Sequence, residues 1–242
     1  MKWALIIGAS GDIGTQTAKD LAQAGWSLYL HFFKSVQKCK RLQAELAQAY
    51  PKQDFLLIQV DLTKKSAAQK ISSQLFSLDA IVFAQGTTFY SLFEQLPIDK
   101  MEEMVKMQLL NPLRLIQLTA AKIAVNHFGR IIFIGSVYGG VGSAMEVGYS
   151  TIKGALSAFV SAYSKEVASL GVTVNVIAPG AVATRMNENM FSKQALQAVA
   201  AQIPAGHLAT GKEISYWVKV LLADQADYLT GQTIYVTGGW LK

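Results

Sequence analysis

The stretch Arg130–Lys153 reads RIIFIGSVYGGVGSAMEVGYSTIK and joins a strand, a glycine-rich loop and the start of a helix. Ile131–Ile134 is an apolar run that predicts a buried strand. Ser136 follows directly, where an open α/β sheet presents its ligand crevice. Tyr149 and Lys153 stand four residues apart, about one helical turn, so both side chains share one face of the helix. The pattern predicts that a hydroxyl, a phenol and an ammonium group meet in one place.

Strands of this kind recur along the chain and alternate with helical segments. Because parallel strands need helical crossovers between them, this alternation predicts a parallel sheet covered on both faces. We therefore predict an α/β Rossmann-type fold, a three-layer, doubly wound parallel sheet of about seven strands. Residues 1–242 are expected to form a single domain, because no repeat or linker interrupts the pattern. The other predicted strands are Trp3–Ile7, Ser27–Phe32, Phe55–Val60, Asp79–Ala84, Val172–Ile177 and Thr233–Thr237.

Composition limits the classes of protein to consider. Hydrophobic residues make up 51% of the chain and charged residues 16%, which suits a large globular core. No apolar run approaches the roughly 20 residues that span a bilayer, so we expect no membrane association. The single cysteine, Cys39, allows no internal disulfide and favours a cytoplasmic location. The net charge of +6 suits an anionic ligand or an acidic protein partner, and without a long basic tract it does not indicate nucleic acid.

A glycine motif lies between the first predicted strand and a helix that runs to about Ala24. Gly8-Ala9-Ser10-Gly11-Asp12-Ile13-Gly14 would let the backbone turn tightly and approach a pyrophosphate at the helix N-terminus. An ordinary tight turn is the alternative. The sequence therefore predicts a dinucleotide site at the start of the chain, and a dinucleotide-binding domain that spans all of it.

The end of the second strand bears on the choice of cofactor. An acidic residue there would bond the ribose 2′-hydroxyl of NAD, whereas basic residues accommodate the 2′-phosphate of NADP. The strand ends His31-Phe32-Phe33-Lys34 without an acid, so we predict NADP(H). Asp61 ends the third strand, where it could contact the adenine or cap the segment that starts near Lys64.

Two later segments leave alternatives open. The helical pattern from Asp99 to His127 is broken at Asn111-Pro112, because proline disfavours helix geometry in the residue before it. Asn111 could offer a polar group to a ligand or a water, although spacing alone favours a helix cap. The irregular segment near 183–207 is a candidate mobile lid on the substrate side, with one short helix near Lys193–Gln202.

Taken together, these motifs resemble the short-chain dehydrogenase/reductase family over the whole chain. Within it, the 3-oxoacyl-[acyl-carrier-protein] reductase-like subgroup is the most similar. The matching pieces, in order, are Gly8-x5-Gly14, Asp61, Asn111, Ser136, Tyr149-x3-Lys153, Val174-Asn175, Pro179-Gly180 with Thr184, and Thr230-Gly231-Gln232 before Gly238-Gly239.

The resemblance implies a role for each site residue in the reduction of a ketone by NADP(H). Tyr149 would give a proton to the carbonyl oxygen, and Lys153 would lower the pKa of the phenol and hold the nicotinamide ribose. Ser136 would polarise the substrate oxygen, and Asn111 would anchor a water in a proton relay, in place of the cap role. No metal is expected. The implied cofactor-binding residues are Gly8, Ser10, Asp12, Ile13, Gly14, His31, Lys34, Asp61, Leu62, Gly86, Tyr149, Lys153, Pro179, Gly180, Val182 and Thr184.

Three features depart from the family pattern. Asp12 replaces the usual second glycine of the first motif, and the neighbouring Gly11 replaces a basic residue that many NADP-preferring members have, which leaves Lys34 and His31 to meet the phosphate. Phe83-Ala84-Gln85-Gly86 stands where the family has Asn-Asn-Ala-Gly, and we expect this to alter stability more than catalysis. His127 and Leu170 occupy the positions of two arginines that dock acyl-carrier protein.

These departures leave more than one function open. The residues also resemble a bacterial branch that reduces a 5-aminopentanone group on a lysine of elongation factor P. A non-catalytic NADP(H) sensor is a third candidate, but Tyr149 and Lys153 argue against it. The resemblance further implies a homotetramer, or a homodimer, packed through Pro112–His127 and Tyr149–Ser169. The loop Tyr138–Val147 is expected to form a wall of the substrate pocket, with Met145 and Val147 suggesting an apolar substrate arm.

Overall fold

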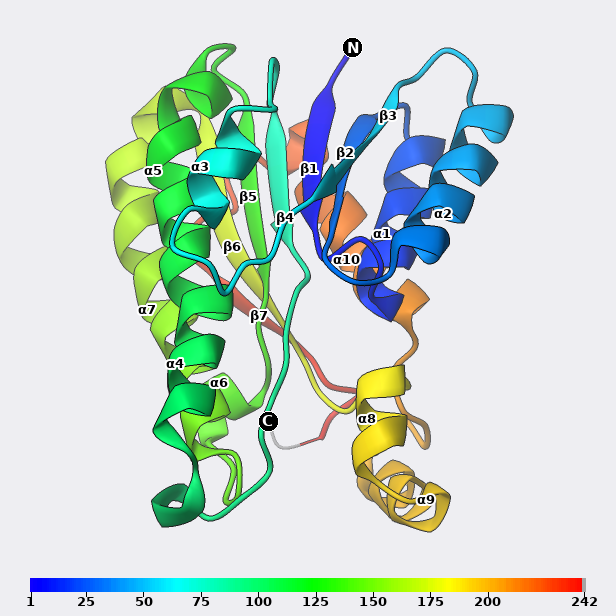
Figure 1. Ribbon diagram of the computed structural model, residues 1–242, viewed down its shortest axis with the longest axis vertical. Coiled ribbons are helices and arrows are strands. Elements are labelled where there is room, and N and C mark those ends of the chain that lie inside the picture. Colours follow the sequence, from blue (N-terminus) through cyan, green and yellow to red (C-terminus); the bar gives the residue numbers. More distant parts are fainter. Residues whose placement is uncertain (241–242) are drawn as a thin grey trace.

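The chain folds around one sheet. The computed structural model describes residues 1–240, and within them seven strands form a sheet in the order β3-β2-β1-β4-β5-β6-β7 (Figure 1). All neighbouring strands are parallel. The predicted fold class is confirmed, and the predicted strands differ from the observed ones only at their ends. The strands are β1 Trp3–Ile7, β2 Ser27–Phe32, β3 Phe55–Gln59, β4 Ala80–Phe83, β5 Gly129–Ile134, β6 Val172–Pro179 and β7 Thr233–Val236.

Two hydrophobic cores lie on the two faces of this sheet. Successive strand residues point to opposite faces, so Leu5 of β1 packs in one core and Ile6 in the other. Figure 1 shows one set of helices on one face of the sheet and a second set on the opposite face. The first set is α1 Asp12–Gln23, α2 Val36–Ala49 and α10 Gly211–Leu221, and the second is α3 Ala67–Ser72, α5 Asn111–Ala124 and α7 Val147–Val167.

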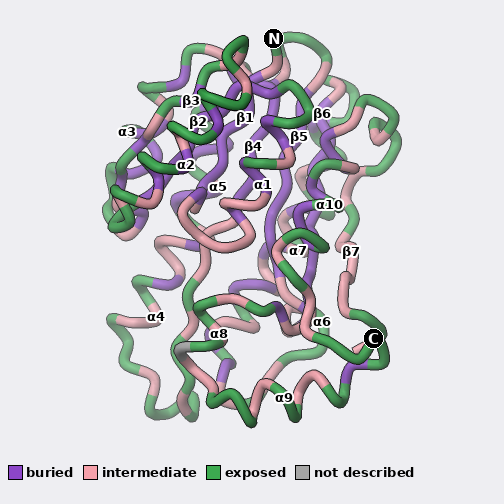
Figure 2. The backbone as a smooth tube through the Cα atoms, turned by 90° about the vertical axis from the view of Figure 1, so that its right-hand side faces the viewer, coloured by how far each residue is buried: buried purple, intermediate pink, exposed green. Residues whose placement is uncertain are grey.

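The strand order sets the position of the ligand crevice. The chain runs from β1 outward to β3 and then returns to add β4 on the other side of β1, so a topological switch point lies between β1 and β4. Four short helices lie beyond the carboxyl ends of the strands in Figure 1: α4 Ile98–Val105, α6 Tyr138–Val141, α8 Arg185–Met190 and α9 Lys193–Gln202. Figure 2 shows most of the sheet buried, with β7 half-buried, whereas α8 and α9 are mostly exposed or half-buried.

The predicted break at Asn111-Pro112 is wrong. Asn111 has helical angles (φ −69°, ψ −39°), and the chain stays helical from α4 through α5. A π-helical turn, Lys106–Leu110, immediately precedes Asn111. Its wider radius gives the proline ring the room that a regular turn would deny it. The helix therefore widens before Pro112 and does not end there.

The segment near 183–207 is more regular than expected. We predicted one short helix at Lys193–Gln202, which is confirmed as α9, but α8 precedes it. Thr184 and Ser192 cap these two helices by accepting hydrogen bonds from the backbone amides of Asn187 and Ala195. Within residues 1–240, no helix combines the length and the apolarity needed to cross a membrane.

Candidate active site

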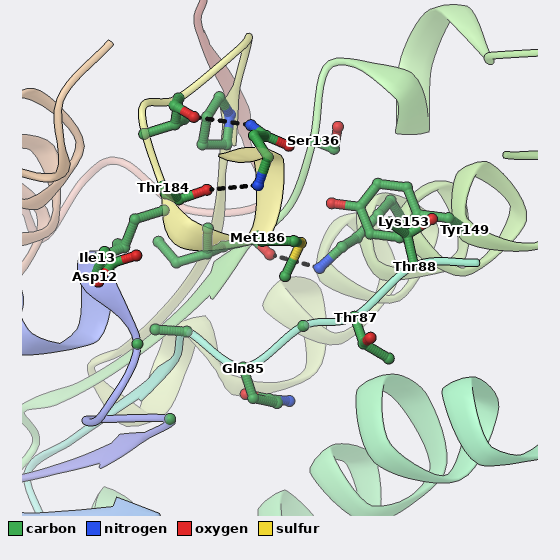
Figure 3. A pocket seen from close by; sticks show the side chains of 18 of the residues that line it. Asp12, Ile13, Gln85, Thr87, Thr88, Ser136, Tyr149, Lys153, Thr184 and Met186 are labelled. Carbon is green, nitrogen blue, oxygen red and sulfur yellow. Dashed lines mark hydrogen bonds between the residues drawn. The ribbon is translucent and has the colours of Figure 1, made fainter. Parts of the chain in front are cut away.

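Ser136, Tyr149 and Lys153 come together as predicted, at the carboxyl end of β5 (Figure 3). Ser136 lies two residues beyond the end of the strand, and its hydroxyl is close enough to the phenol of Tyr149 to act on its pKa. The Nζ of Lys153 lies 5.3 Å from the centre of the Tyr149 ring and donates to the carbonyl of Ile134 over 2.9 Å. Strand, loop and helix thus hold a hydroxyl, a phenol and an ammonium group in one place.

Burial is the main cause of the pKa shifts of Tyr149 and Lys153. It raises the pKa of the Tyr149 phenol, and the nearby hydroxyl of Ser136 opposes that rise. Burial outweighs the lowering of this pKa that we expected from Lys153, whose ammonium group is directed to the carbonyl of Ile134. Burial also lowers the pKa of Lys153 to about 8, so the amine is still mostly protonated at neutral pH. The phenol therefore keeps its proton, which is the form that a proton donor needs.

These residues face a cleft of about 1030 Å³, which the predicted dinucleotide site shares. All of the predicted cofactor-binding residues line the cleft except Gly14. A Cβ on Gly14 would lie 2.2 Å from the carbonyl oxygen of Gly8, so this glycine lets α1 pack against the turn. Gly8 itself has φ +84°, and a Cβ there would lie 2.8 Å from the backbone nitrogen of Gln85.

The turn has the features that a pyrophosphate requires. Gly8, Ser10 and Gly11 line the cleft at the start of the twelve-residue helix α1, with little side-chain bulk. Helix N-termini with bare backbone bind anions. The residues present therefore fit a dinucleotide: the turn would hold its pyrophosphate, and Lys34 would lie at the adenosine end.

His31 does not have the predicted charged role. The side chain is buried under the glycine turn, where Nδ1 accepts from the amide of Gly8 (3.3 Å) and Nε2 donates to the carbonyl of Val60 (3.0 Å). Burial lowers the pKa of His31 to about 4, so the ring is neutral and cannot attract a phosphate. Lys34 is exposed and lines the cleft, which leaves it as the cation at the end of β2.

Asp12, the unusual residue of the glycine motif, is neutralised by two cations. Its carboxylate lies 3.4 Å from Nζ of Lys38 and 3.2 Å from Nε of Arg185, and it also accepts the backbone amide of Arg185. Burial alone would raise the pKa of Asp12, but Arg185 and Lys38 more than offset that and lower it. Arg185 also donates to the carbonyl of Ser10, so helix α8 is fastened to the glycine turn.

Asp61 is placed where it could contact the adenine, which stays a prediction, and it also fixes a turn. It lines the cleft, and its Oδ1 accepts hydrogen bonds from the amide (2.9 Å) and the hydroxyl (2.8 Å) of Thr63. These hydrogen bonds with Thr63 fix the turn that leads towards α3. At the far end of the cleft, Thr184 caps α8 and faces the same space.

Asn111 is not at the site, and its predicted role must be corrected. Its Nδ2 donates to the carbonyls of Leu62 and Lys64, and its side chain does not line the cleft. The wide turn before Pro112 instead holds Gln108 behind the cleft, next to Gly86, which lines it. Gln108 donates to the carbonyl of Thr87, and its Oε1 is buried without a partner among the described residues. Sequence reasoning missed this amide on the apolar side of the helix.

The side chains of Gln108 and Lys153 both lie close to Gly86. A Cβ on Gly86 would be 3.4 Å from Oε1 of Gln108 and 3.9 Å from Nζ of Lys153.

Phe83, where the family has asparagine, is buried and stacks on Phe133 with ring centres 4.6 Å apart. Aromatic packing thus occupies the position where the family has asparagine.

The substrate side of the cleft differs from the apolar wall that we predicted. From the loop Tyr138–Val147 the lining residues are Tyr138, Ser143, Ala144 and Glu146, whereas Met145 and Val147 do not line it. Helices α8 and α9 supply apolar residues to the cleft, including Met186, which Figure 3 shows near Lys153. Sequence reasoning did not identify Glu146, a buried acid whose charge acts on the phenol of Tyr149.

Comparison with known proteins agrees with this geometry. Residues 2–195 match the family model for short chain dehydrogenases. The chain is 36% identical to the uncharacterized oxidoreductase YmfI of Bacillus subtilis, with 99% of this chain and 98% of that one covered. It is 32% identical to the 3-oxoacyl-[acyl-carrier-protein] reductase FabG of Escherichia coli, over 98% and 96% of the two chains.

A solved structure agrees as well. YwfH, described as an NADPH dependent reductase involved in bacilysin biosynthesis, superposes with a TM-score of 0.89 at 25% identity, over 98% of this chain and 97% of that one. The fold, the meeting of Ser136 with Tyr149 and Lys153, and these relatives lead to one conclusion. The chain belongs to the short-chain dehydrogenase/reductase family and is an NAD(P)-dependent oxidoreductase that acts on CH–OH or C=O groups.

Proposed function

We propose that this protein reduces a ketone to a secondary alcohol with NADPH, and that Tyr149 is the proton donor. The observation that carries this proposal is the meeting of Ser136, Tyr149 and Lys153 in a cleft that also holds the glycine turn. A phenol whose pKa is raised by burial keeps its proton until an acceptor oxygen arrives.

The residues divide the work of the reaction. NADPH, when bound, supplies a hydride to the carbonyl carbon. Ser136 accepts a hydrogen bond from the amide of Tyr138, so its own hydroxyl proton remains available to the substrate oxygen. Tyr149 gives its proton to that oxygen, and the C=O double bond becomes a C–OH single bond. The nearby ammonium of Lys153 then stabilises the phenolate until a proton returns.

The preference for NADPH rests on the end of β2. Lys34 is exposed on the cleft, and no acidic side chain stands at the strand end to repel a 2′-phosphate. Because His31 is neutral, Lys34 carries this preference without help from the histidine. NADH and NADPH used with comparable kcat/KM would contradict it.

The substrate that we propose first is a 3-oxoacyl group on acyl-carrier protein, as for the FabG relatives. A second candidate is the 5-aminopentanone group on elongation factor P. It is favoured by His127 and Leu170, which stand just before β5 and β6 in place of the two carrier-docking arginines. Offering acetoacetyl-carrier protein and ketone-modified elongation factor P separately, each with NADPH, tests both. A two-hydrogen mass gain on only one of them identifies the substrate, and no gain on either would contradict both.

We also propose that the protein is a homotetramer, or a homodimer, packed through α5 and α7. Leu118 on α5 and Val125 at its end expose 40% and 72% of their surface in the single chain, which an interface would cover. Light scattering that gives the mass of a monomer would contradict this.

A further inference from the structure

Glu146 places a buried acid in the substrate part of the cleft. Only 7% of the residue is exposed. It precedes α7 directly, yet its carboxylate does not cap that helix. Instead Oε1 accepts a hydrogen bond of 2.8 Å from the hydroxyl of Thr88. Oε2 has no hydrogen-bond partner among the described residues and is not enclosed, so it opens on the cleft that Glu146 lines.

The backbone holds this carboxylate in place at some cost. Met145 has φ +64°, the left-handed region that side-chain-bearing residues seldom adopt. Such a residue costs of order 1–3 kcal/mol and persists only where its surroundings impose it. Here the carbonyl of Met145 accepts from the amide of Ser91, so the loop that carries Thr88 is joined to the loop that carries Glu146. Two contacts thus fix the acid.

Among residues 1–240, no cation pairs with Glu146. The described residues include no ion pair with it, although several basic side chains line the cleft. Lys153 donates to a backbone carbonyl, Arg185 pairs with Asp12, and Lys64 lies near Asp61. Burial accordingly raises the pKa of Glu146, the shift expected of a desolvated carboxyl group that lacks a counter-ion.

Aromatic side chains surround the same part of the cleft. Tyr90 meets Phe191 edge to face at 5.8 Å, and Tyr138 lies 6.2 Å from Trp240 between ring centres. All four line the cleft. Burial raises the pKa of Tyr138, and the nearby charge of Glu146 raises it further. A carboxylate beside electron-rich ring faces attracts an ammonium group and repels a phosphate or a carboxylate.

We propose that the ketone reduced at Tyr149 carries an ammonium group, which pairs with Glu146 within this aromatic wall. The assignment rests on the proposed ketone reduction, adds the charge of the substrate to it, and favours the second candidate substrate over the 3-oxoacyl group. Glu146 also acts on the phenol of Tyr149, so the ammonium would lie near the reacting carbonyl. The protein therefore selects an amino ketone, or a lysine-derived one, over a neutral ketone of the same shape.

Matched pairs of small ketones test this without a protein partner. One series of methyl ketones ends in a trimethylammonium group and the other in the isosteric tert-butyl group, over a range of spacer lengths. We measure the ratio of kcat/KM for the cationic ketone to that for its neutral partner. The wild-type ratio is expected to reach about tenfold at the best spacer, and Glu146→Gln to lower that ratio by about tenfold to a hundredfold.

Glu103→Gln is the matched control, because Glu103 also lines the cleft but pairs with Lys100. It should leave the ratio close to that of the wild type. A wild-type ratio of about one at every spacer length, with both series turned over, would overturn the ammonium assignment and leave ketone reduction standing. If the wild-type protein consumes NADPH with neither series, both proposals fail. A ratio that Glu103→Gln lowers as much as Glu146→Gln would also overturn the role of Glu146.

Discussion

Replacing His31 by glutamine should flatten the dependence of stability on pH. The ring is buried and its pKa is about 4, whereas a histidine in the unfolded chain has a pKa of 6.5. Below about pH 6.5 the unfolded chain binds a proton that the folded chain does not, so stability falls as the pH drops towards 4. The full difference between the two pKa values corresponds to about 3.4 kcal/mol of unfolding free energy. About 2 kcal/mol of that is lost between pH 7 and pH 5.

The assay is urea unfolding of wild-type protein and His31→Gln at pH 7 and pH 5, at one protein concentration. Glutamine keeps hydrogen-bonding groups for Gly8 and Val60 but does not titrate. Carboxyl groups, His127 and His207 are the same in both proteins, so their effects cancel. The loss of unfolding free energy between the two pH values should be about 2 kcal/mol smaller in the variant. Equal losses in both proteins would refute the account of a buried, neutral His31.

Three further changes test the glycine turn and the cofactor side of the cleft. Gly14→Ala should lower the unfolding free energy by about 1–3 kcal/mol in chemical denaturation and weaken NADPH binding, because its Cβ would lie 2.2 Å from the oxygen of Gly8; an unchanged midpoint would contradict the packing. Lys34→Glu should reduce kcat/KM for NADPH by roughly tenfold or more and spare NADH, since the new carboxylate repels a 2′-phosphate; equal loss with both would count against Lys34. Arg185→Ala should weaken NADPH binding by less than about tenfold in a fluorescence titration, because its partly exposed pair with Asp12 contributes about 0.2–1 kcal/mol; a larger loss would show that α8 depends on this pair.

The fold could be predicted because its signals are local. Five of the seven described strands are short, fully buried and mostly apolar runs, and the helices between the strands follow from spacing, so the parallel sheet needed no distant information. Ser136, Tyr149 and Lys153 lie within one strand, loop and helix, and their meeting follows from that order. Gly8 and Gly14 likewise lie in one short stretch, Gly8 in the turn after β1 and Gly14 in the first turn of α1.

The errors arose where geometry depends on contacts far apart in the sequence. The position of Asn111 was misjudged because a π-helical turn, not a break, precedes Pro112 and holds Gln108 behind the cleft. The charge of His31 was misjudged because the burial of its ring under the glycine turn is a property of the fold. Glu146 was overlooked because its partner, Thr88, comes from another loop of the cleft.

Tyr149→Phe tests the central claim most directly. The substitution removes only the phenolic oxygen, so the cleft and the glycine turn that would bind NADPH stay intact. The account predicts that NADPH binding, followed by fluorescence titration, remains close to that of the wild type, while NADPH-dependent ketone reduction falls by roughly a hundredfold or more. Ketone reduction at a near-normal rate in Tyr149→Phe would contradict Tyr149 as the proton donor.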